Sequence, residues 1–505
     1  MYKLKDKGID NNLAKSGESL SQRVIRGGFW IFALRMSARA FGLIRLTILA
    51  RILAPHDFGL MGIALLTMAT LETFSQTGFQ QALIQKKDDT DTYLDAAWTV
   101  LILRGFILFI ILFFMAPYVA IFFKVPQAKL IIQVIGLSVL FQAFTNIGVV
   151  YFQKELEFNK QFIYQLSRTL ADFIVAISAV LILQSVWALV FGLLAGNFVG
   201  FVVSYLMHPY RPRLSLNLKK AKELFGFGKW LLGSSIVVFL SNQGDDIFLG
   251  RVLGVTALGF YQMAFRFANL PGSEIGVLSR VAFPAYSKLQ DNIPKLRNGY
   301  LKMLRFVNFL SIPLVGGIFV LGPKFTQIFL GDKWMPIVPA LRILAISVMI
   351  RVIVGTSGAL FNAKGRPDMS FKMDLARVIT LAVAIYPLTM LWKISGTSLS
   401  VLLAVCATIP IWIIGSAREA KLEVSDYLRA LLPPLIGAAI MSAVLFGLGM
   451  CFNQFQLVGF LVSVVAGLAT FLGFIFLIQN IVDYAIFKDI KFIFNRLGSG
   501  DRARL

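Results

Sequence analysis

The chain has 505 residues, of which 57% are hydrophobic and only 15% are charged, and its mean hydropathy is +0.75. A soluble domain carries about 25% charged residues, so this composition excludes a soluble globular protein and indicates a polytopic membrane protein. The formal net charge of +23 could indicate nucleic-acid binding, so the position of the basic residues along the chain has to be considered.

Apolar stretches of 20 or more residues follow one another, each long enough to cross a hydrocarbon core of about 30 Å as a helix. The polar, lysine-rich segment 1–26 has no apolar core or cleavage site, so no removable signal peptide is expected. We predict an all-α membrane protein with fourteen transmembrane helices, at 27–52, 57–84, 94–117, 129–151, 161–184, 186–207, 229–250, 256–285, 299–321, 336–362, 371–392, 396–417, 428–450 and 457–482.

Basic residues are distributed unevenly between the two sets of loops. The loops on the side of the termini hold 31 Lys and Arg, and the opposite loops hold seven. By the positive-inside rule this places both termini in the cytoplasm, as expected of a multi-pass protein of the bacterial inner membrane. The net charge therefore orients the protein in the membrane, and no nucleic-acid partner is predicted.

The first twelve helices form an internal repeat, in which the offset grows from 200 to 209 residues along the chain. Six helices per repeat is an even number, so the two repeats are parallel, with a site expected between them near the midplane. The matched positions are Gly28 and Gly228, Trp30 and Trp230, Arg51 and Arg251, Pro117 and Pro323, and Arg168 and Arg377.

The repeat gives a domain organisation in chain order. We predict a cytoplasmic segment 1–26, a six-helix bundle 27–208, a linker 209–228, a second six-helix bundle 229–420, two accessory helices 421–484 and a cytoplasmic tail 485–505. Apolar residues share one face over 217–227 and over 486–497, which indicates amphipathic helices at the membrane surface or, alternatively, solvated loops.

Eleven basic residues remain inside the predicted spans, and all of them are arginines. An arginine at the centre of a lipid-facing helix costs about 2.5–3.5 kcal/mol, so most must face water, a partner charge or the interface. Arg168 with Asp172 and Asp374 with Arg377 have the spacing of intrahelical ion pairs. Arg280, Arg305 and Arg342 lie near helix ends, from which they can reach the interface.

The other arginines predict a cationic cavity for an anionic substrate, because a guanidinium stays charged and binds phosphate through two hydrogen bonds. The predicted substrate-binding residues are Arg35, Arg39, Arg45, Arg104, Arg266 and Arg351.

Acidic residues at similar depth are candidates for ion coupling or, alternatively, for structural ion pairs. Adjacent Asp245 and Asp246 cannot both face one direction, so one is free to bind a cation or a proton while the other pairs with an arginine. Glu72 and Glu274 fall at nearly equivalent repeat positions. Pro271 and Gly272, just before Glu274, predict a break in the eighth helix.

Motifs for other chemistry are missing from the sequence. It contains no phosphate-binding G-x-x-x-x-G-K-[ST] loop, no H-E-x-x-H motif and no cysteine cluster. Cys406 and Cys451 lie in apolar stretches, and His56 and His208 lie at predicted helix ends. We therefore expect no metal, no cofactor and no enzymatic activity.

Three stretches carry a resemblance to a known family: 49–60 (LARILAPHDFGL), 246–254 (DIFLGRVLG) and 257–261 (ALGFY). They resemble the polysaccharide transporter family, the Wzx-type flippases of the MOP superfamily, over roughly residues 20–485. The resemblance implies two MATE-like six-helix bundles around a central cavity, with two accessory helices. It also implies translocation of an undecaprenyl-diphosphate-linked oligosaccharide by alternating access, for O-antigen, capsule or exopolysaccharide synthesis.

A polysaccharide polymerase and a co-polymerase are the protein partners that this pathway implies, besides membrane lipids. A lipid II flippase is an alternative with the same helix number and a cationic cavity. A MATE multidrug exporter should instead have an acidic cavity and twelve helices, and a membrane polymerase should carry a large exterior loop that this chain lacks.

Overall fold

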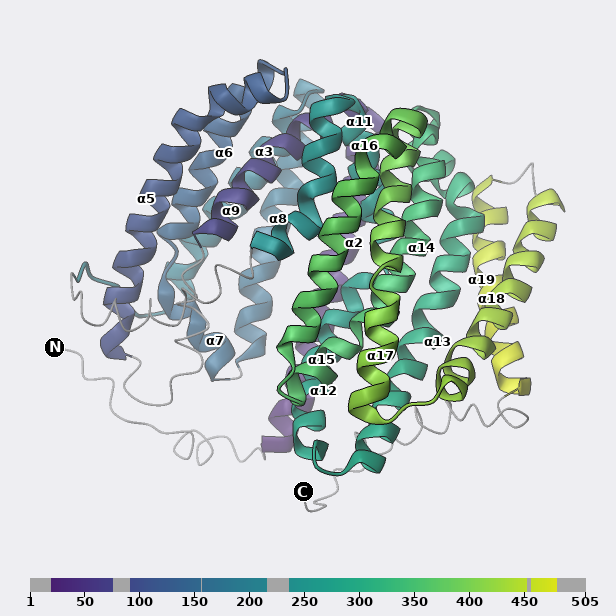
Figure 1. The fold of residues 1–505 in the computed structure, drawn as a ribbon. Coiled ribbons are helices and arrows are strands. Elements are labelled where there is room, and N and C mark those ends of the chain that lie inside the picture. Colours follow the sequence, from purple (N-terminus) through teal and green to yellow (C-terminus); the bar gives the residue numbers. More distant parts are fainter. Residues whose placement is uncertain (1–19, 76–90, 156, 216–235, 452–455, 479–505) are drawn as a thin grey trace. The chain divides into compact units, whose positions relative to one another are not determined.

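The computed structural model describes residues 20–75, 91–155, 157–215, 236–451 and 456–478 (Figure 1). Every regular element within these ranges is helical, which confirms the all-α prediction. The predicted amphipathic segments 217–227 and 486–497 fall outside these ranges. The chain folds into two compact units. Of the described residues, 20–53, 63–75, 91–155, 157–215 and 236 belong to the first unit, and 54–62, 237–451 and 456–478 belong to the second.

The first unit is a bundle in which α8 and α9 form the most extensive helix pair. A Cβ atom at Gly196 would lie 3.1 Å from the Arg168 carbonyl oxygen, so glycines on α9 allow its backbone to approach α8 closely. The helices are α2 (Leu20–Ile52), the greater part of α3 (Pro55–Phe74), α5 (Asp91–Phe122), α6 (Gln127–Ala143), η1 (Ile147–Val149), α7 (Val150–Lys154), α8 (Phe158–Leu183) and α9 (Trp187–Met207).

One predicted span of the first unit is sharply bent. The span expected at 129–151 consists of α6 and the η1–α7 pair, whose axes differ by 70°. Asn146 fixes the bend, because its side chain accepts a hydrogen bond from the Gly148 N–H and donates one to the Tyr210 carbonyl. The bend therefore depends on a contact with the segment that follows α9.

The second unit contains the helical segment 236–252 and the first residues of α3. Its other elements are α11 (Val255–Ala268), α12 (Gly272–Leu289), α13 (Ile293–Phe325), η2 (Thr326–Leu330), η3 (Asp332–Ile337), α14 (Val338–Gly355), α15 (Ser357–Ala363), α16 (Pro367–Cys406), α17 (Ile409–Ala420), α18 (Val424–Cys451) and α19 (Gln456–Ile478).

Two breaks in the second unit follow from local sequence. The predicted break at Pro271 and Gly272 is confirmed, since α11 ends at Ala268 and α12 begins at Gly272. The backbone of α16 leaves helical geometry at Trp392 and Lys393, and the Ser400 hydroxyl beyond this point bonds back to the Ala384 carbonyl at 3.1 Å. The chain therefore reverses within α16, between the two spans predicted at 371–392 and 396–417.

The start of α3 crosses the start of α11 at a glycine contact within the second unit. A Cβ atom at Gly59 would clash with the Val255 carbonyl, and one at Gly259 would clash with the Pro55 carbonyl. The two contacts are related by the 200-residue offset of the repeat, so this crossing is symmetric in sequence and requires glycine on both helices.

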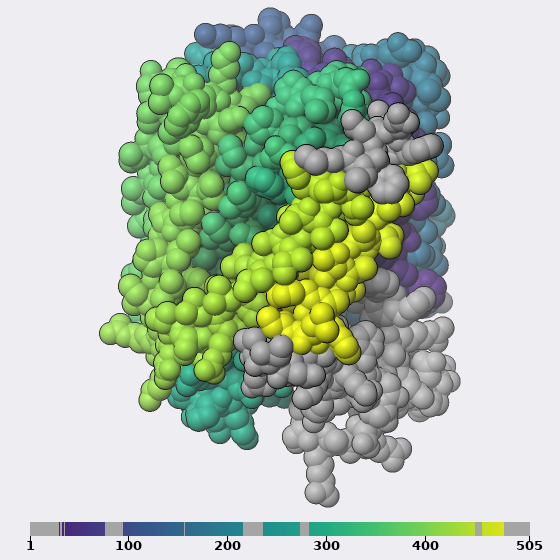
Figure 2. Space-filling view, turned by 90° about the vertical axis from the view of Figure 1, so that its right-hand side faces the viewer, coloured from purple at the N-terminus to yellow at the C-terminus, as the bar shows by residue number. Residues whose placement is uncertain are grey.

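The accessory helices α18 and α19 pack on α13. Figure 2 shows them as a lime-to-yellow band that runs diagonally across the green helices of the second unit. Gly316 of α13 lies against Ala438 and Met441 of α18, and Phe471 of α19 completes the apolar contact.

The protein is a multi-pass membrane protein. Among the described residues, nine helices are long and apolar enough to cross a membrane, or ten if the bent pair is one span. One of the nine, Pro367–Ala420, has 54 residues, about 80 Å of helix, and its reversal at Lys393 supplies two crossings. These numbers are compatible with fourteen spans, and the full count stays a prediction.

Candidate functional site

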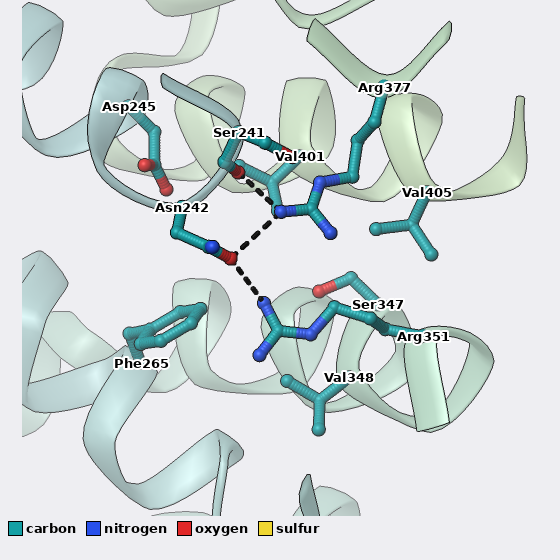
Figure 3. A pocket seen from close by; sticks show the side chains of 10 residues that line it. All are labelled: Ser241, Asn242, Asp245, Phe265, Ser347, Val348, Arg351, Arg377, Val401 and Val405. Atoms are coloured by element: carbon teal, nitrogen blue, oxygen red, sulfur yellow. Dashed lines mark hydrogen bonds between the residues drawn. The ribbon is translucent and has the colours of Figure 1, made fainter. Parts of the chain in front are cut away.

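A polar pocket lies inside the second unit, between the helical segment 236–252, α11, α14 and α16. Its cavity measures about 20 Å³, which is room for roughly one water molecule. Figure 3 shows the side chains that line it: Ser241, Asn242, Asp245, Phe265, Ser347, Val348, Arg351, Arg377, Val401 and Val405.

Two arginines from different helices meet at one amide group in this pocket. Arg377 of α16 donates to the Asn242 side-chain oxygen at 2.9 Å and to the Ser241 carbonyl at 2.6 Å. Arg351 of α14 donates to the same amide oxygen at 3.5 Å, and its guanidinium lies 6.0 Å from the Phe265 ring centroid (Figure 3). Both cations are therefore held by neutral acceptors.

Two adjacent carboxylates on the segment 236–252 lie beside these arginines. Asp245 is 5% exposed and accepts a hydrogen bond from the Tyr261 hydroxyl, while its Oδ1 atom has no hydrogen-bond partner. The Asp246 carboxylate bonds to Gln262, and its own Oδ1 atom is likewise buried without a partner. Burying an ionised carboxylate without a paired charge is very unfavourable, so these groups are suited to binding a proton.

The charges of the pocket interact without forming direct ion pairs. Arg351 and Arg377 both lie within electrostatic range of Asp245 and Asp374. None of the ion pairs within 4 Å found in the described residues joins these groups. The two guanidiniums therefore keep the capacity to bind an anion through paired hydrogen bonds.

Among the predicted arginines of the first unit, Arg45 has a protein partner. Its Nη2 atom lies 2.9 Å from the Asp172 Oδ1 atom, and the two side chains are only 16% and 28% exposed. Asp172 was expected to pair with Arg168 on its own helix, and this expectation is wrong, because Arg168 donates instead to the Asn197 side chain on α9 at 2.7 Å. The partners of Arg168 and Asp172 are therefore determined by contacts with other helices and not by their four-residue spacing on α8.

Arg104 closes the end of α3. Its guanidinium donates to the Ser75 carbonyl at 2.9 Å and to the Glu72 carbonyl at 3.2 Å, with further bonds to the Ser75 hydroxyl. Carbonyls at the end of a helix lack helical partners and are stabilised by such a cation. The Glu72 carboxylate lies within electrostatic range of the same arginine, so these two predicted site residues belong together structurally.

Two further predicted arginines, Arg39 and Arg266, are not among the residues that line the pocket. Arg39 lies half-buried on α2, and Arg266 is exposed in the last turn of α11. The side chains of Arg35 on α2 and Glu274 on α12 are not among those that the structure describes. Of the predicted substrate-binding arginines, the pocket contains Arg351, and of the predicted acids it contains Asp245, with Asp246 directly behind.

Arg377 and Asn242 are pocket residues that the sequence did not assign to the site. Arg377 was expected to form an ion pair with Asp374, yet its guanidinium donates to Ser241 and Asn242, and the carboxylate acts on it from beyond 4 Å. A signal was present in the sequence, because Ser241 and Asp245 are four residues apart and place a polar stripe on an apolar helix.

The chain matches the model of a protein family described as "Polysaccharide biosynthesis protein" over residues 48–339. It is 28% identical over 374 residues to the lipopolysaccharide biosynthesis protein WzxC of Escherichia coli K12, covering 73% of this chain and 75% of that protein. It is 25% identical over 465 residues to the teichuronic acid biosynthesis protein TuaB of Bacillus subtilis 168, covering 90% and 95%.

Solved structures support the fold. The lipid II flippase MurJ in its inward closed conformation superposes with a TM-score of 0.72, at 15% identity, over 89% of this chain and 100% of that one. A MATE multidrug transporter of the MOP superfamily in its inward-facing conformation gives a TM-score of 0.59, at 16% identity, over 76% and 95%. At these identities the similarity shows the fold alone, which is the predicted MATE-like architecture.

Proposed function

The chain belongs to the family of polysaccharide biosynthesis proteins, and from this premise we propose that it is a flippase for a lipid-linked oligosaccharide. The resemblance to the Wzx-type polysaccharide transporters is thereby confirmed. The observation that carries the proposal is the pair Arg351 and Arg377, two cations held by neutral acceptors in a membrane-embedded pocket. The proposed substrate is an oligosaccharide linked to undecaprenyl diphosphate, a repeat unit of a surface polysaccharide.

In this proposal the two arginines receive the diphosphate. Each guanidinium offers a planar set of N–H donors, so two of them supply four charge-assisted hydrogen bonds to phosphate oxygens. Asn242 holds both guanidiniums in one place until the anion replaces it as the acceptor. Because the cavity is only water-sized, the phosphate enters after a rearrangement, consistent with alternating access.

Asp245 is proposed to link proton binding to substrate binding. As a carboxylate it compensates the positive charge of Arg351 and Arg377, and when protonated it leaves both cations available to the diphosphate. Tyr261 donates a hydrogen bond to Asp245, and Asp246 lies within electrostatic range of it. Gln262 bonds to Asp246, and Asp374 lies within electrostatic range of the two arginines. Glu72 is assigned no coupling role, because it lies beside Arg104 at the end of α3.

The cellular setting follows from the same proposal. We place the protein in the bacterial inner membrane with both termini in the cytoplasm, as the charge asymmetry of the loops predicts. A polysaccharide polymerase and its co-polymerase are the proposed protein partners, since they would consume the oligosaccharide delivered to the outer leaflet. The residue ranges 27–208 and 229–420 are the proposed transport bundles, and 421–484 the accessory helices.

Reconstitution in proteoliposomes tests the proposed function. We expect the wild-type protein to move an undecaprenyl-diphosphate oligosaccharide between leaflets, and Arg351→Ala with Arg377→Ala to slow this at least tenfold. Arg342→Ala is the matched control, because Arg342 is another arginine of a predicted span, and its Nε–H donates to the Phe319 carbonyl at 2.9 Å outside the pocket. Movement of lipid II alone, or export of a lipophilic cation alone, would replace the proposal with one of its two alternatives.

A further inference from the structure

The membrane helix that carries Arg351 is interrupted one turn beyond that residue, at Gly355-Thr356-Ser357-Gly358, here called the GTSG segment. The helix α14 ends at Gly355 and α15 begins at Ser357. At the junction the Thr356 N–H bonds to the Ile353 carbonyl at 3.3 Å, three residues back instead of four. Such a local tightening inside a longer helix commonly marks a hinge.

Neither glycine of the segment is required by packing. A Cβ atom at Gly355 or at Gly358 would meet no heavy atom within 4 Å, and both residues have ordinary negative φ angles. Gly59 and Gly259 differ, because a side chain there would clash with backbone. Since glycine weakens a helix relative to alanine, the two glycines lower the stability of this helix without serving any contact.

The two residues between the glycines weaken the helix further. The Thr356 hydroxyl donates to the Ile353 carbonyl and the Ser357 hydroxyl donates to the Val354 carbonyl, each at 2.7 Å. Hydroxyls that bond back to the preceding turn compete with the helical hydrogen bonds and bend helices. Four consecutive residues therefore favour bending at the same place.

The neighbours of the helix differ in part between the two sides of the segment, although α16 and one apolar cluster contact both sides. Above it, α14 packs against α11, α13 and α16, and Arg351 faces the polar pocket. Below it, α15 packs against α12, α16 and α17, with Leu360 and Phe361 fully buried. Tyr300 of α13 contacts the segment itself, since its hydroxyl bonds to Thr356 at 3.2 Å and accepts from the Trp412 ring N–H at 2.9 Å.

From these observations we infer that the GTSG segment is a hinge that positions Arg351 relative to Arg377 during transport. Arg351 lies four residues before Gly355, about 6 Å along the helix axis. A bend of about 20° at the segment, the size of an ordinary helix kink, therefore moves Arg351 by about 2 Å. That shift is enough to break its bond to Asn242, which is already 3.5 Å long.

The hinge inference rests on the proposed transport function for its role, but its mobility is measurable without transport. Hydrogen exchange of the full-length protein in lipid nanodiscs reports how often the helix opens at the segment. In the double variant Gly355→Ala, Gly358→Ala we expect opening to fall about fivefold for each alanine, and exchange of the following amides to slow accordingly. Unchanged exchange there would overturn the inference.

The transport assay supplies the second arm. The double variant should transport at least tenfold more slowly than wild type although its helix is more stable, a combination that a merely structural glycine does not produce. Gly317→Ala on α13 is the matched control, because its Cβ atom also meets nothing within 4 Å, and it should leave the transport rate unchanged. Slowed exchange with wild-type transport would equally contradict the hinge.

The two proposals fail in different ways. A wild-type protein that moves no lipid-linked oligosaccharide contradicts the proposed function, and the exchange measurement then decides the hinge alone. Tyr300→Phe provides an independent check, because it removes the bonds to Thr356 and Trp412 while keeping the ring. It should accelerate exchange at the segment, and slower exchange would count against the assigned anchor.

Discussion

The two units place charges of opposite sign on equivalent helices, but only the first unit joins them in an ion pair. At the 200-residue offset of the repeat, Arg45 of α2 corresponds to Asp245. In the first unit Arg45 contacts Asp172 of α8 directly at 2.9 Å. In the second unit the acid is on the first helix and the base, Arg377, is on α16, and no ion pair within 4 Å was found between them.

This difference separates an ion pair within the protein from the pair of arginines that we propose binds the substrate. In the first unit the Arg45 guanidinium contacts the Asp172 carboxylate directly, so the pair contributes to packing between α2 and α8. In the second unit, Arg351 and Arg377 donate to Asn242. One carboxylate oxygen each of Asp245 and Asp246 has no hydrogen bond. Incomplete pairing leaves a site able to exchange partners, which transport requires.

The largest expected effect is on the ion pair of the first unit. Arg45→Ala removes the guanidinium that contacts the partly buried Asp172 carboxylate at 2.9 Å. It should lower the free energy of unfolding by about 3 kcal/mol, measured by thermal unfolding in detergent. Replacing both partners with leucine should restore most of this loss. The charge swap Arg45→Asp, Asp172→Arg gives the first unit the polarity of the second and should also fold.

If Arg45→Ala were as stable as the wild type, the contact between Arg45 and Asp172 would not contribute to stability. Arg45 would then return to the set of candidate substrate-binding arginines. The proposed contrast between the two units would be lost.

The second effect concerns the arginines of the pocket. Arg351→Lys and Arg377→Lys keep the charge but lose the planar pair of donors, which should weaken binding of undecaprenyl diphosphate by about 2 kcal/mol, roughly 30-fold. Arg168→Lys is the control, because Arg168 corresponds to Arg377 in the repeat yet donates to Asn197. Arg168→Lys should reduce stability and leave the dissociation constant for undecaprenyl diphosphate unchanged. If it weakened binding as much as the pocket variants do, both units would bind the anion.

The helical architecture was predictable because its signals are local. The length of each apolar stretch predicts a span, and Pro271 with Gly272 predicts the break between α11 and α12. The bend after α6 was not predictable, because the residues at the bend include no glycine or proline until Gly148. It is fixed by Asn146, whose partners are Ser204 on α9 and Tyr210 beyond it.

The site was only partly predictable, because partners in another helix decide the role of each arginine. The four-residue spacing of Arg168 and Asp172 predicted a local pair, yet each has a partner in a different helix. Arg351 was predicted as a substrate-binding residue from its depth in an apolar span, and it lines the pocket. Arg377 was set aside because an acid lay three residues away, although its hydrogen bonds go to the segment 236–252.

The third prediction tests what allows the ion pair to close. A Cβ atom at Gly192 would lie 2.7 Å from the Ala176 Cβ, 2.8 Å from the Asp172 Oδ1 and 3.1 Å from the Arg45 Nη2. Gly192→Ala should therefore separate the charges and lower the free energy of unfolding by about 1.5 kcal/mol. Gly244→Ala is the control in the second unit, because its nearest neighbour is 3.9 Å away; equal losses in both variants would refute the role given to Gly192.

The smallest expected effect compares the two amides that accept from the equivalent arginines. Asn197 is 5% exposed, so Asn197→Ala leaves Arg168 with a buried, unsatisfied donor and should lower the free energy of unfolding by about 1 kcal/mol. Asn242 is exposed, and Asn242→Ala should change stability by less than about 0.5 kcal/mol. Asn242→Ala should instead raise the affinity for the substrate, because Arg351 and Arg377 then have no amide oxygen to release before they bind phosphate. A stability loss at Asn242 as large as at Asn197, with unchanged affinity, would show that the second amide is as structural as the first.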